Sequence, residues 1–371
     1  MKHVVVFGAG QIGRAVHKMV LDLWPHHGMN TDNVVNSVLV DGSEANLSLN
    51  TAGGVRENIL MDLQSATHEE IVKLLQDESA EYVINALPFS FNEKVASAAA
   101  AAKCNYIDFT EDDVMADKVQ KIYEGTGLTC AVKCGLAPGF INYVGYNLVG
   151  LMDTPDSLMI SVGALPRTVS YDLSHPENSY NLTWSVDGLV NEYIRPCRIR
   201  KDGKLQEIPA LGGLTKVVID GTEYEAAYTS GGVGSLARDL INVPNVCYMT
   251  LRYPGHYRYI REVVQETRGN FLKLRSIFLD KFPFTDDDVI VVYATATGKD
   301  ATGAHVRRAY SNRFYGVDGF TGIQATTAGS GVAMLELMLA GKLQGIVNHD
   351  SISLAEFTST TAFGKYYKTS K

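Results

Sequence analysis

The sequence predicts an α/β fold, in which a doubly wound parallel sheet carries an inserted α+β domain with a mixed or antiparallel sheet. Three observations support this prediction. The first part alternates short apolar runs with helical patterns, residues after Ser157 alternate apolar with polar side chains, and a small-residue helical pattern returns near the end. With 371 residues, of which 46% are hydrophobic, the chain can bury two cores. We expect domains at 1–141 and 142–318, with 319–371 packing back on the first.

The first predicted strand, residues 4–7, runs directly into the string GAGQIG, after which apolar residues recur at helical spacing. Strand, glycine turn and helix together form a dinucleotide-binding fingerprint of the Rossmann type. The first glycine permits the tight turn, the second lets a pyrophosphate approach the backbone, and the third lets helix and strand pack closely. A turn that binds no nucleotide is the alternative. The predicted cofactor-binding residues of this turn are Gly8, Gly10, Gln11, Ile12 and Gly13.

The second strand, residues 38–40, ends at Asp41, where an acid binds the adenosine ribose in this fold. The spacing from Gly8 to Asp41 is long, and we attribute the excess to the polar insertion at 25–33. Asp41 would repel a 2′-phosphate, and residues 42–44 offer no cation to hold one. The sequence therefore favours NAD over NADP as the cofactor.

The next elements continue the alternation of strand and helix. We expect a buried strand at 82–86, a helix at 92–102, a strand in CNYIDFTED, a strand ending at Gly135 and a helix starting near Gly139. Pro88 and Phe89 follow the strand at 82–86, so we expect them to border the nicotinamide ribose, with a simple turn as the alternative. Leu87 and Pro88 are further predicted cofactor-binding residues.

From Ser157 onward the pattern is that of an α+β domain. The segment DDVIVVYATATGKDATGAHVRRAYSNRF predicts a hairpin that turns at GKDATG, and Thr326 and Thr327 precede the small-residue helix. This order predicts an active site in the cleft between the inserted domain and the nucleotide domain.

Composition excludes several classes of protein. The formal net charge is −8 and no long basic stripe occurs, which argues against a nucleic-acid partner. No apolar run is long enough for a signal peptide or a membrane span, so we expect a cytoplasmic protein. The five cysteines are scattered and lack the spacing of a zinc site, and the acids at 286–288 lack further ligands, so we expect no metal.

The chain resembles the saccharopine dehydrogenase family over nearly its whole length, most closely its lysine 6-dehydrogenase branch. The resemblance rests on VVVFGAGQIGRAV, NALPFSFNEKVASAAAAAKCNYIDFTED, CGLAPGFINYV, VGALP, NLTWSVDGLVNEYIRP, IPAL, TLRYPGH and ATTAGSGVAMLELMLAGKL. It implies a Rossmann domain with an α/β substrate domain, a nicotinamide cofactor, hydride transfer at a carbon that bears nitrogen, and assembly as a homodimer.

Two departures from the saccharopine-type pattern bear on the substrate. Ala137 stands in GLAPG where those members carry an acid, and AYTSGGVGSLA has no Arg where they present an Asn-Arg-Asp-type turn. A substrate with several carboxylates would lack its counter-ions. We therefore expect oxidative deamination of lysine or a similar amine to the semialdehyde and ammonia. The alternatives are reductive condensation, as in saccharopine or carboxynorspermidine dehydrogenases, and a catalytically silent nucleotide-binding protein.

Candidate residues for this chemistry follow from residue type and position. Arg252 is a bidentate candidate for the substrate carboxylate, or else an interface ion pair. His256 is a candidate general base, with a structural hydrogen bond as the alternative. Trp184 offers an apolar wall for an aliphatic chain or a core contact. The remaining candidates are Glu111 and Asp112 for proton transfer and Pro138 and Gly139 for substrate binding.

Overall fold

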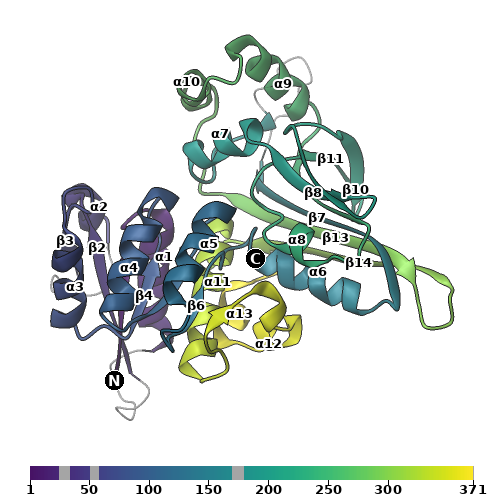
Figure 1. The fold of residues 1–371 in the computed structure, drawn as a ribbon. Coiled ribbons are helices and arrows are strands. Elements are labelled where there is room, and N and C mark those ends of the chain that lie inside the picture. The colour runs from purple at the N-terminus through teal and green to yellow at the C-terminus, as the bar shows by residue number, and fades with distance from the viewer. Residues whose placement is uncertain (25–33, 51–57, 169–178, 371) are drawn as a thin grey trace. The chain divides into compact units, whose positions relative to one another are not determined.

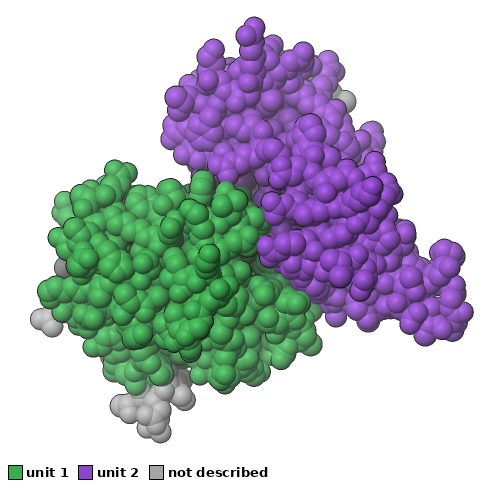
Figure 2. Space-filling view, in the orientation of Figure 1, with its two compact units in different colours: residues 1–139, 324–367 green, residues 140–323, 368–371 purple. Residues whose placement is uncertain are grey.

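The computed structural model describes residues 1–24, 34–50, 58–168 and 179–370. The polar insertion at 25–33 lies outside the described residues. The chain forms two compact units, residues 1–139 with 324–367 and residues 140–323 with 368–371 (Figure 2). The sequence analysis expected borders at 141/142 and 318/319. Within the described ranges, no helix is long and apolar enough to cross a membrane.

The first unit, which carries the labels β2, β3, β4 and β6 in Figure 1, contains a parallel sheet. Its seven strands have the order β15-β6-β5-β4-β1-β2-β3. Its strands are β1 (Lys2–Phe7), β2 (Val35–Asp41), β3 (Asn58–Leu60), β4 (Tyr82–Asn85), β5 (Asn105–Asp108), β6 (Cys130–Ala131) and β15 (Ile346–Val347). The chain leaves β1 toward β2 on one side and returns to β4 on the other. Ligands bind at such a switch point, beyond the carboxyl ends of the strands.

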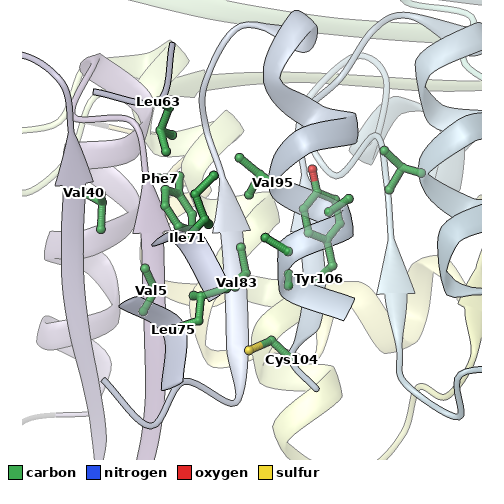
Figure 3. Packing of buried hydrophobic residues seen from close by; sticks show 14 of the residues in the cluster. Val5, Phe7, Val40, Leu63, Ile71, Leu75, Val83, Val95, Cys104 and Tyr106 are labelled. Carbon is green, nitrogen blue, oxygen red and sulfur yellow. The ribbon is translucent and has the colours of Figure 1, made fainter. Parts of the chain in front are cut away.

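Helices cover both faces of this sheet. They are α1 (Gln11–Leu23), α2 (Glu44–Ser48), α3 (His68–Asp77), α4 (Asn92–Ala101), α5 (Asp113–Tyr123), α11 (Gly322–Leu339), α12 (Leu354–Thr358) and α13 (Thr361–Tyr366). On one face, Val5 and Phe7 of β1 pack with Ile71 of α3 and Val95 of α4 (Figure 3). Val4 and Val6, which alternate with them, are also buried. Strands buried on both faces explain the near-continuous apolar runs of the sequence.

The second unit contains a mixed sheet of eight strands, with the path β10-β11-β12-β7-β13-β14 and with β8 and β9 beside β12. The strands are β7 (Thr154–Pro166), β8 (Cys197–Lys201), β9 (Lys204–Ile208), β10 (Thr215–Ile219), β11 (Thr222–Tyr228), β12 (Asn245–Arg252), β13 (Asp288–Lys299) and β14 (His305–Tyr315). Only β7 and β12 pair in parallel among these described strands. The helices are α6 (Phe140–Gly150), α7 (Val186–Ile194), α8 (Leu236–Asp239), α9 (His256–Thr267) and α10 (Phe271–Lys281).

The predicted fold class is confirmed, a Rossmann-type parallel sheet with an inserted mixed-sheet domain. The hairpin that turns at GKDATG is also present, with Lys299 opposite His305. Two predicted boundaries are wrong. The strand expected to end at Gly135 stops at Ala131, because Lys133 adopts a left-handed φ of 62° and its N–H binds the Asp108 side chain. The helix expected after Thr327 begins at Gly322, because the Asp288 carboxylate caps the N–H groups of Gly322 and Ile323.

Candidate cofactor and substrate sites

The glycine turn at the exit of β1 is built by close backbone contacts. Gly8 has φ +98°, and a Cβ there would lie 3.0 Å from the carbonyl carbon of Ala86, just past β4. A Cβ on Gly13 would lie 1.7 Å from the Gly8 carbonyl oxygen. A Cβ on Gly10 would meet no atom within 4 Å, and its φ of −68° suits any residue. Packing therefore requires glycine at positions 8 and 13, whereas neither packing nor backbone conformation requires glycine at position 10.

Helix α1 begins directly after Gly10, with no side-chain cap and no acid in its first turn. The first N–H groups of a helix have no partner within the helix and carry partial positive charge. Gln11 is exposed and Ile12 half-buried at this helix start. An uncapped helix start behind an unobstructed glycine suits the pyrophosphate of a dinucleotide.

Asp41 ends β2 beside this turn. Its Oδ2 accepts from Ala9 N at 2.6 Å, and its Oδ1 accepts from Ser43 N at 2.8 Å. Each carboxylate oxygen has further lone pairs that can accept from ribose hydroxyls. Arg14 lies close enough that the Asp41 charge raises the Arg14 pKa, against the lowering caused by burial. Arg14 lies outside residues 42–44, from which the absence of a cation for a 2′-phosphate was predicted.

Residues at the exits of β4 and β5 form a buried polar network. Leu87 N donates to Asn85 Oδ1 at 3.2 Å, and Pro88 is exposed. Asn85 Nδ2 donates to Asn92 Oδ1 at 2.9 Å, and Asn92 Nδ2 donates to Asp108 Oδ2 at 2.8 Å. Burial raises the Asp108 pKa to about 6, against hydrogen bonds that lower it. This network was not predicted from the sequence, although Asn85 lies in the strand predicted at 82–86 and Asp108 lies in the strand predicted within CNYIDFTED.

The two candidate acids after β5, Glu111 and Asp112, differ in exposure and in hydrogen bonding. Asp112 Oδ1 accepts from Met115 N at 2.9 Å and so caps α5, whereas Glu111 is exposed. Asp113 instead pairs with Lys133, which is 5% exposed. Proton transfer by Glu111 or Asp112 stays a prediction.

The segment GLAPG forms a tight turn. Gly135 N donates to Pro138 O at 3.0 Å, and Gly139 has φ +136°. A Cβ on Gly139 would lie 1.9 Å from the Gly135 carbonyl oxygen. Gly139 is therefore required by the turn itself, and substrate binding by Pro138 and Gly139 stays a prediction.

In the second unit, the structure brings Arg252 and His256 together around a buried ion pair. Arg252 at the end of β12 is 1% exposed, and its Nη2 lies 3.0 Å from Glu192 Oε2 on α7. Its Nε donates to Tyr193 Oη at 2.9 Å, and its guanidinium carbon lies 4.8 Å from the centroid of the Tyr180 ring. Binding of a substrate carboxylate by Arg252 would therefore have to occur beside an existing partner.

Glu192 was not among the predicted residues. It also accepts from Thr229 Oγ1 at 3.2 Å and from Thr250 Oγ1. Thr250 and Arg252 are two residues apart on β12 and so share one face of the strand. The signal available in the sequence was a single acid within the apolar helical stretch LVNEYI. Removing one member of such a buried pair leaves the other charge unpaired, at a cost of roughly 3–5 kcal/mol.

His256 is completely buried at the start of α9, with Nε2 at 2.9 Å from Tyr193 Oη. Burial and the adjacent Arg252 charge lower its pKa well below 6.5. A histidine with a depressed pKa is a weaker proton acceptor at neutral pH than the general-base role requires.

Trp184 is half-buried and packs against the first turn of α7. A Cβ on Gly188 would lie 2.4 Å from Trp184 Cζ3, so this indole has a packing role. A wall for substrate stays a prediction. In the described part of the chain, no group of three His, Cys, Asp or Glu residues could hold a metal ion.

Comparison with known proteins places these features in context. Residues 4–127 match the saccharopine dehydrogenase NADP binding domain, and residues 135–360 match the saccharopine dehydrogenase C-terminal domain. The solved saccharopine dehydrogenase (L-Glu forming) from Saccharomyces cerevisiae is 17% identical, with 99% of each chain covered and a TM-score of 0.75. The homospermidine synthase from Legionella pneumophila, solved with NAD, is 11% identical, with 99% of this chain and 90% of that chain covered and a TM-score of 0.67. These two structures share the fold.

Proposed function

The chain belongs to the saccharopine dehydrogenase family, and from this premise we propose that it oxidises the terminal CH–NH2 group of L-lysine or a similar amino acid with NAD. As a member it is an NAD(P)-dependent dehydrogenase. The proposed products are the semialdehyde and ammonia. When bound, the nicotinamide supplies the acceptor for the hydride.

The preference for NAD rests on Asp41. Its carboxylate lies at the carboxyl end of β2, beside the glycine turn, where an acid accepts from the ribose hydroxyls and repels a 2′-phosphate. Arg14 instead favours NADP, because an arginine near the ribose can accommodate the 2′-phosphate. We give Asp41 the greater weight because its carboxylate is held by two backbone amides, whereas Arg14 Nη1 donates to Ala9 O on the same turn.

The choice of substrate rests on Ala137 and on the turn 229–235. The turn 229–235 carries no cation that could pair with a second or third carboxylate, and position 137 carries no acid. An amino acid with one carboxylate and a terminal amine leaves fewer charges unpaired on binding. For this oxidation the ammonium loses a proton, its carbon loses a hydride, and water then adds to the iminium and displaces ammonia.

A reductive condensation of saccharopine type is the second candidate. It is favoured by the similarity to the yeast saccharopine dehydrogenase, which spans 99% of each chain. That reaction would require an aldehyde and an amino acid together with the reduced cofactor.

The test is an assay of the purified full chain with NAD and L-lysine at mildly alkaline pH, following NADH and ammonia together. We expect equal release of both, with a higher kcat/KM for NAD than for NADP. NADH formed from saccharopine alone, or NADH consumed only when aldehyde and amino acid are both present, would identify the second candidate. Binding of NADH without turnover of any amine would instead indicate a silent nucleotide-binding protein.

A further inference from the structure

Three buried polar atoms without a hydrogen-bond partner gather beside the Glu192–Arg252 pair. Among the described residues, Tyr180 Oη, Thr183 Oγ1 and His256 Nδ1 are buried and make no hydrogen bond of normal geometry. Their side chains are from 0% to 4% exposed. The Tyr180 and His256 ring centroids are 4.9 Å apart. Buried polar atoms nearly always have a partner, so three of them in one place indicate a group that the protein itself does not provide.

Thr183 belongs to this cluster through Tyr180. Burial raises the Tyr180 pKa, whereas the Arg252 charge and weak hydrogen bonds with the Trp184 and Thr183 side chains lower it. Neither of these two contacts has the geometry of a normal hydrogen bond. Two hydroxyls and one imidazole nitrogen therefore share a buried location within the second unit.

The proton on His256 can be assigned from the hydrogen-bond chain. Arg252 Nε carries a proton and donates to Tyr193 Oη, so the tyrosine proton points to His256 Nε2. The low pKa keeps the imidazole neutral, which leaves its one proton on Nδ1. The unpartnered nitrogen is thus a donor, and both hydroxyls can donate as well.

The charges around this location favour an acceptor with negative charge. The Arg252 guanidinium lies over the Tyr180 ring, while the Glu192 carboxylate is already engaged by Arg252, Thr229 and Thr250. Hydrogen bonds from such donors to an ionised carboxylate are roughly twice as strong as neutral ones.

We propose that Tyr180, Thr183 and the Nδ1–H group of His256 bind the carboxylate of the amino-acid substrate. The proposal rests on the proposed function and specifies how its substrate is held. It makes His256 a hydrogen-bond donor to the substrate and places the carboxylate beside the Glu192–Arg252 pair. Amines that lack a carboxylate gain nothing from these three groups.

The test uses Tyr180→Phe and Thr183→Val, which remove a hydroxyl and keep the shape of the side chain. Calorimetry on the NADH-loaded full chain measures binding of L-lysine, L-lysinamide, cadaverine and saccharopine, without dependence on turnover. We expect each variant to bind lysine roughly tenfold or more weakly and cadaverine within about twofold of wild type, because only lysine carries the carboxylate.

The unliganded protein provides an independent readout. Removing a buried hydroxyl that has no partner relieves its desolvation cost, so both variants should unfold at the wild-type temperature or above it. Thr229→Val is the matched control, because the Thr229 hydroxyl is bonded to Glu192. That variant should unfold at a lower temperature and should weaken lysine and cadaverine alike.

The outcomes separate this inference from the proposed function. If wild type binds saccharopine in place of lysine and the variants weaken saccharopine, the proposed substrate is wrong and the carboxylate site stands. Equal losses for lysine and cadaverine, or lower unfolding temperatures of both unliganded variants, would overturn the carboxylate site alone. Binding of no amino acid by wild type would overturn both.

Discussion

At the scale of single residues, the three glycines of the first turn serve different needs. Gly13 is required by packing, because its Cβ would lie 1.7 Å from the Gly8 oxygen, whereas a Cβ on Gly10 meets nothing within 4 Å. Packing thus accounts for Gly13 but not for Gly10, and we propose that the cofactor accounts for Gly10.

We therefore predict opposite behaviour of Gly10→Ala and Gly13→Ala. Gly13→Ala should lower the free energy of unfolding by about 3 kcal/mol or more through overpacking. Gly10→Ala should change it by only about 0.5 kcal/mol, yet weaken NADH binding more than roughly tenfold because the methyl group occupies the path of the pyrophosphate. Urea unfolding and fluorescence titration with NADH check both. Wild-type affinity of Gly10→Ala would contradict this account of the site.

The strand, glycine turn and helix at the start of the chain could be predicted from the sequence because their signals are local. The strand, the glycine spacing and Asp41 all lie within 41 residues. The cluster in the second unit joins Glu192 to Arg252 across 60 positions, which depends on how α7 packs on β12. Arg252 and His256 were predicted by residue type, whereas their burial, their partners and the low His256 pKa come only from that packing.

At the scale of elements, Asp108 joins the exits of neighbouring strands. It ends β5, accepts from Asn92 of α4 and also accepts the backbone N–H groups of Thr110 and Lys133. The Asp108 carboxylate therefore connects α4 by hydrogen bonds to the segments that follow β5 and β6. Its burial raises its pKa to about 6 from an ordinary 3.8.

This shift predicts a particular dependence of stability on pH. Between about pH 4 and pH 6 the folded protein keeps the Asp108 proton while the unfolded chain loses it. The contribution of Asp108 to the free energy of unfolding is therefore greatest below pH 4 and falls as pH rises. The stability difference between wild type and Asp108→Asn should shrink by about 3 kcal/mol across that window. Urea unfolding at several pH values measures it, with Asp117→Asn, an exposed acid on α5, as the control. Parallel curves for wild type and Asp108→Asn would refute the assignment.

Most predicted elements exist, but their ends depend on distant partners. Helix α11 starts at Gly322 because Asp288, 34 positions earlier, supplies its cap. The two-residue strand β6 ends where Asp108 takes the Lys133 N–H. Apolar periodicity predicts the middle of an element, and a cap from elsewhere in the chain sets its end.

At the scale of the whole molecule, the first unit is built from two separate parts of the chain. Strand β15 pairs with β6, and Cys130 N donates to Gly345 O at 2.9 Å. In α11, Gly331 packs against Phe109, since a Cβ there would lie 2.5 Å from that ring. The second unit has its own buried clusters.

We predict that residues 140–323 fold alone and that residues 1–139 do not. The isolated second unit should unfold cooperatively in urea with dispersed amide signals in NMR spectra. Residues 1–139 should lack both properties, because the partners of β6 and Phe109 are missing. Joining 139 to 324–367 through a flexible linker of about 15 residues should restore folding and NADH binding. Cooperative folding and NADH binding by 1–139 alone would contradict this prediction.

The alternation of strand and helix predicted the parallel sheet, the alternation of apolar and polar residues after Ser157 predicted the second sheet, and the returning helical pattern predicted a discontinuous first domain. The order of strands in the second sheet could not be predicted, because β7 pairs with β12 across 88 residues and with β13 across 122 to 145 residues, and no local pattern specifies such a register.

The pairing of β15 with β6 also sets an order of events on the ribosome. At about 5–20 residues per second, β15 leaves the ribosome roughly 10–40 s after β6, with the whole second unit synthesised in between. The inserted unit can thus finish folding while the nucleotide-binding unit still waits for its last strand. The nascent chain therefore presents β6 as an open sheet edge during that interval.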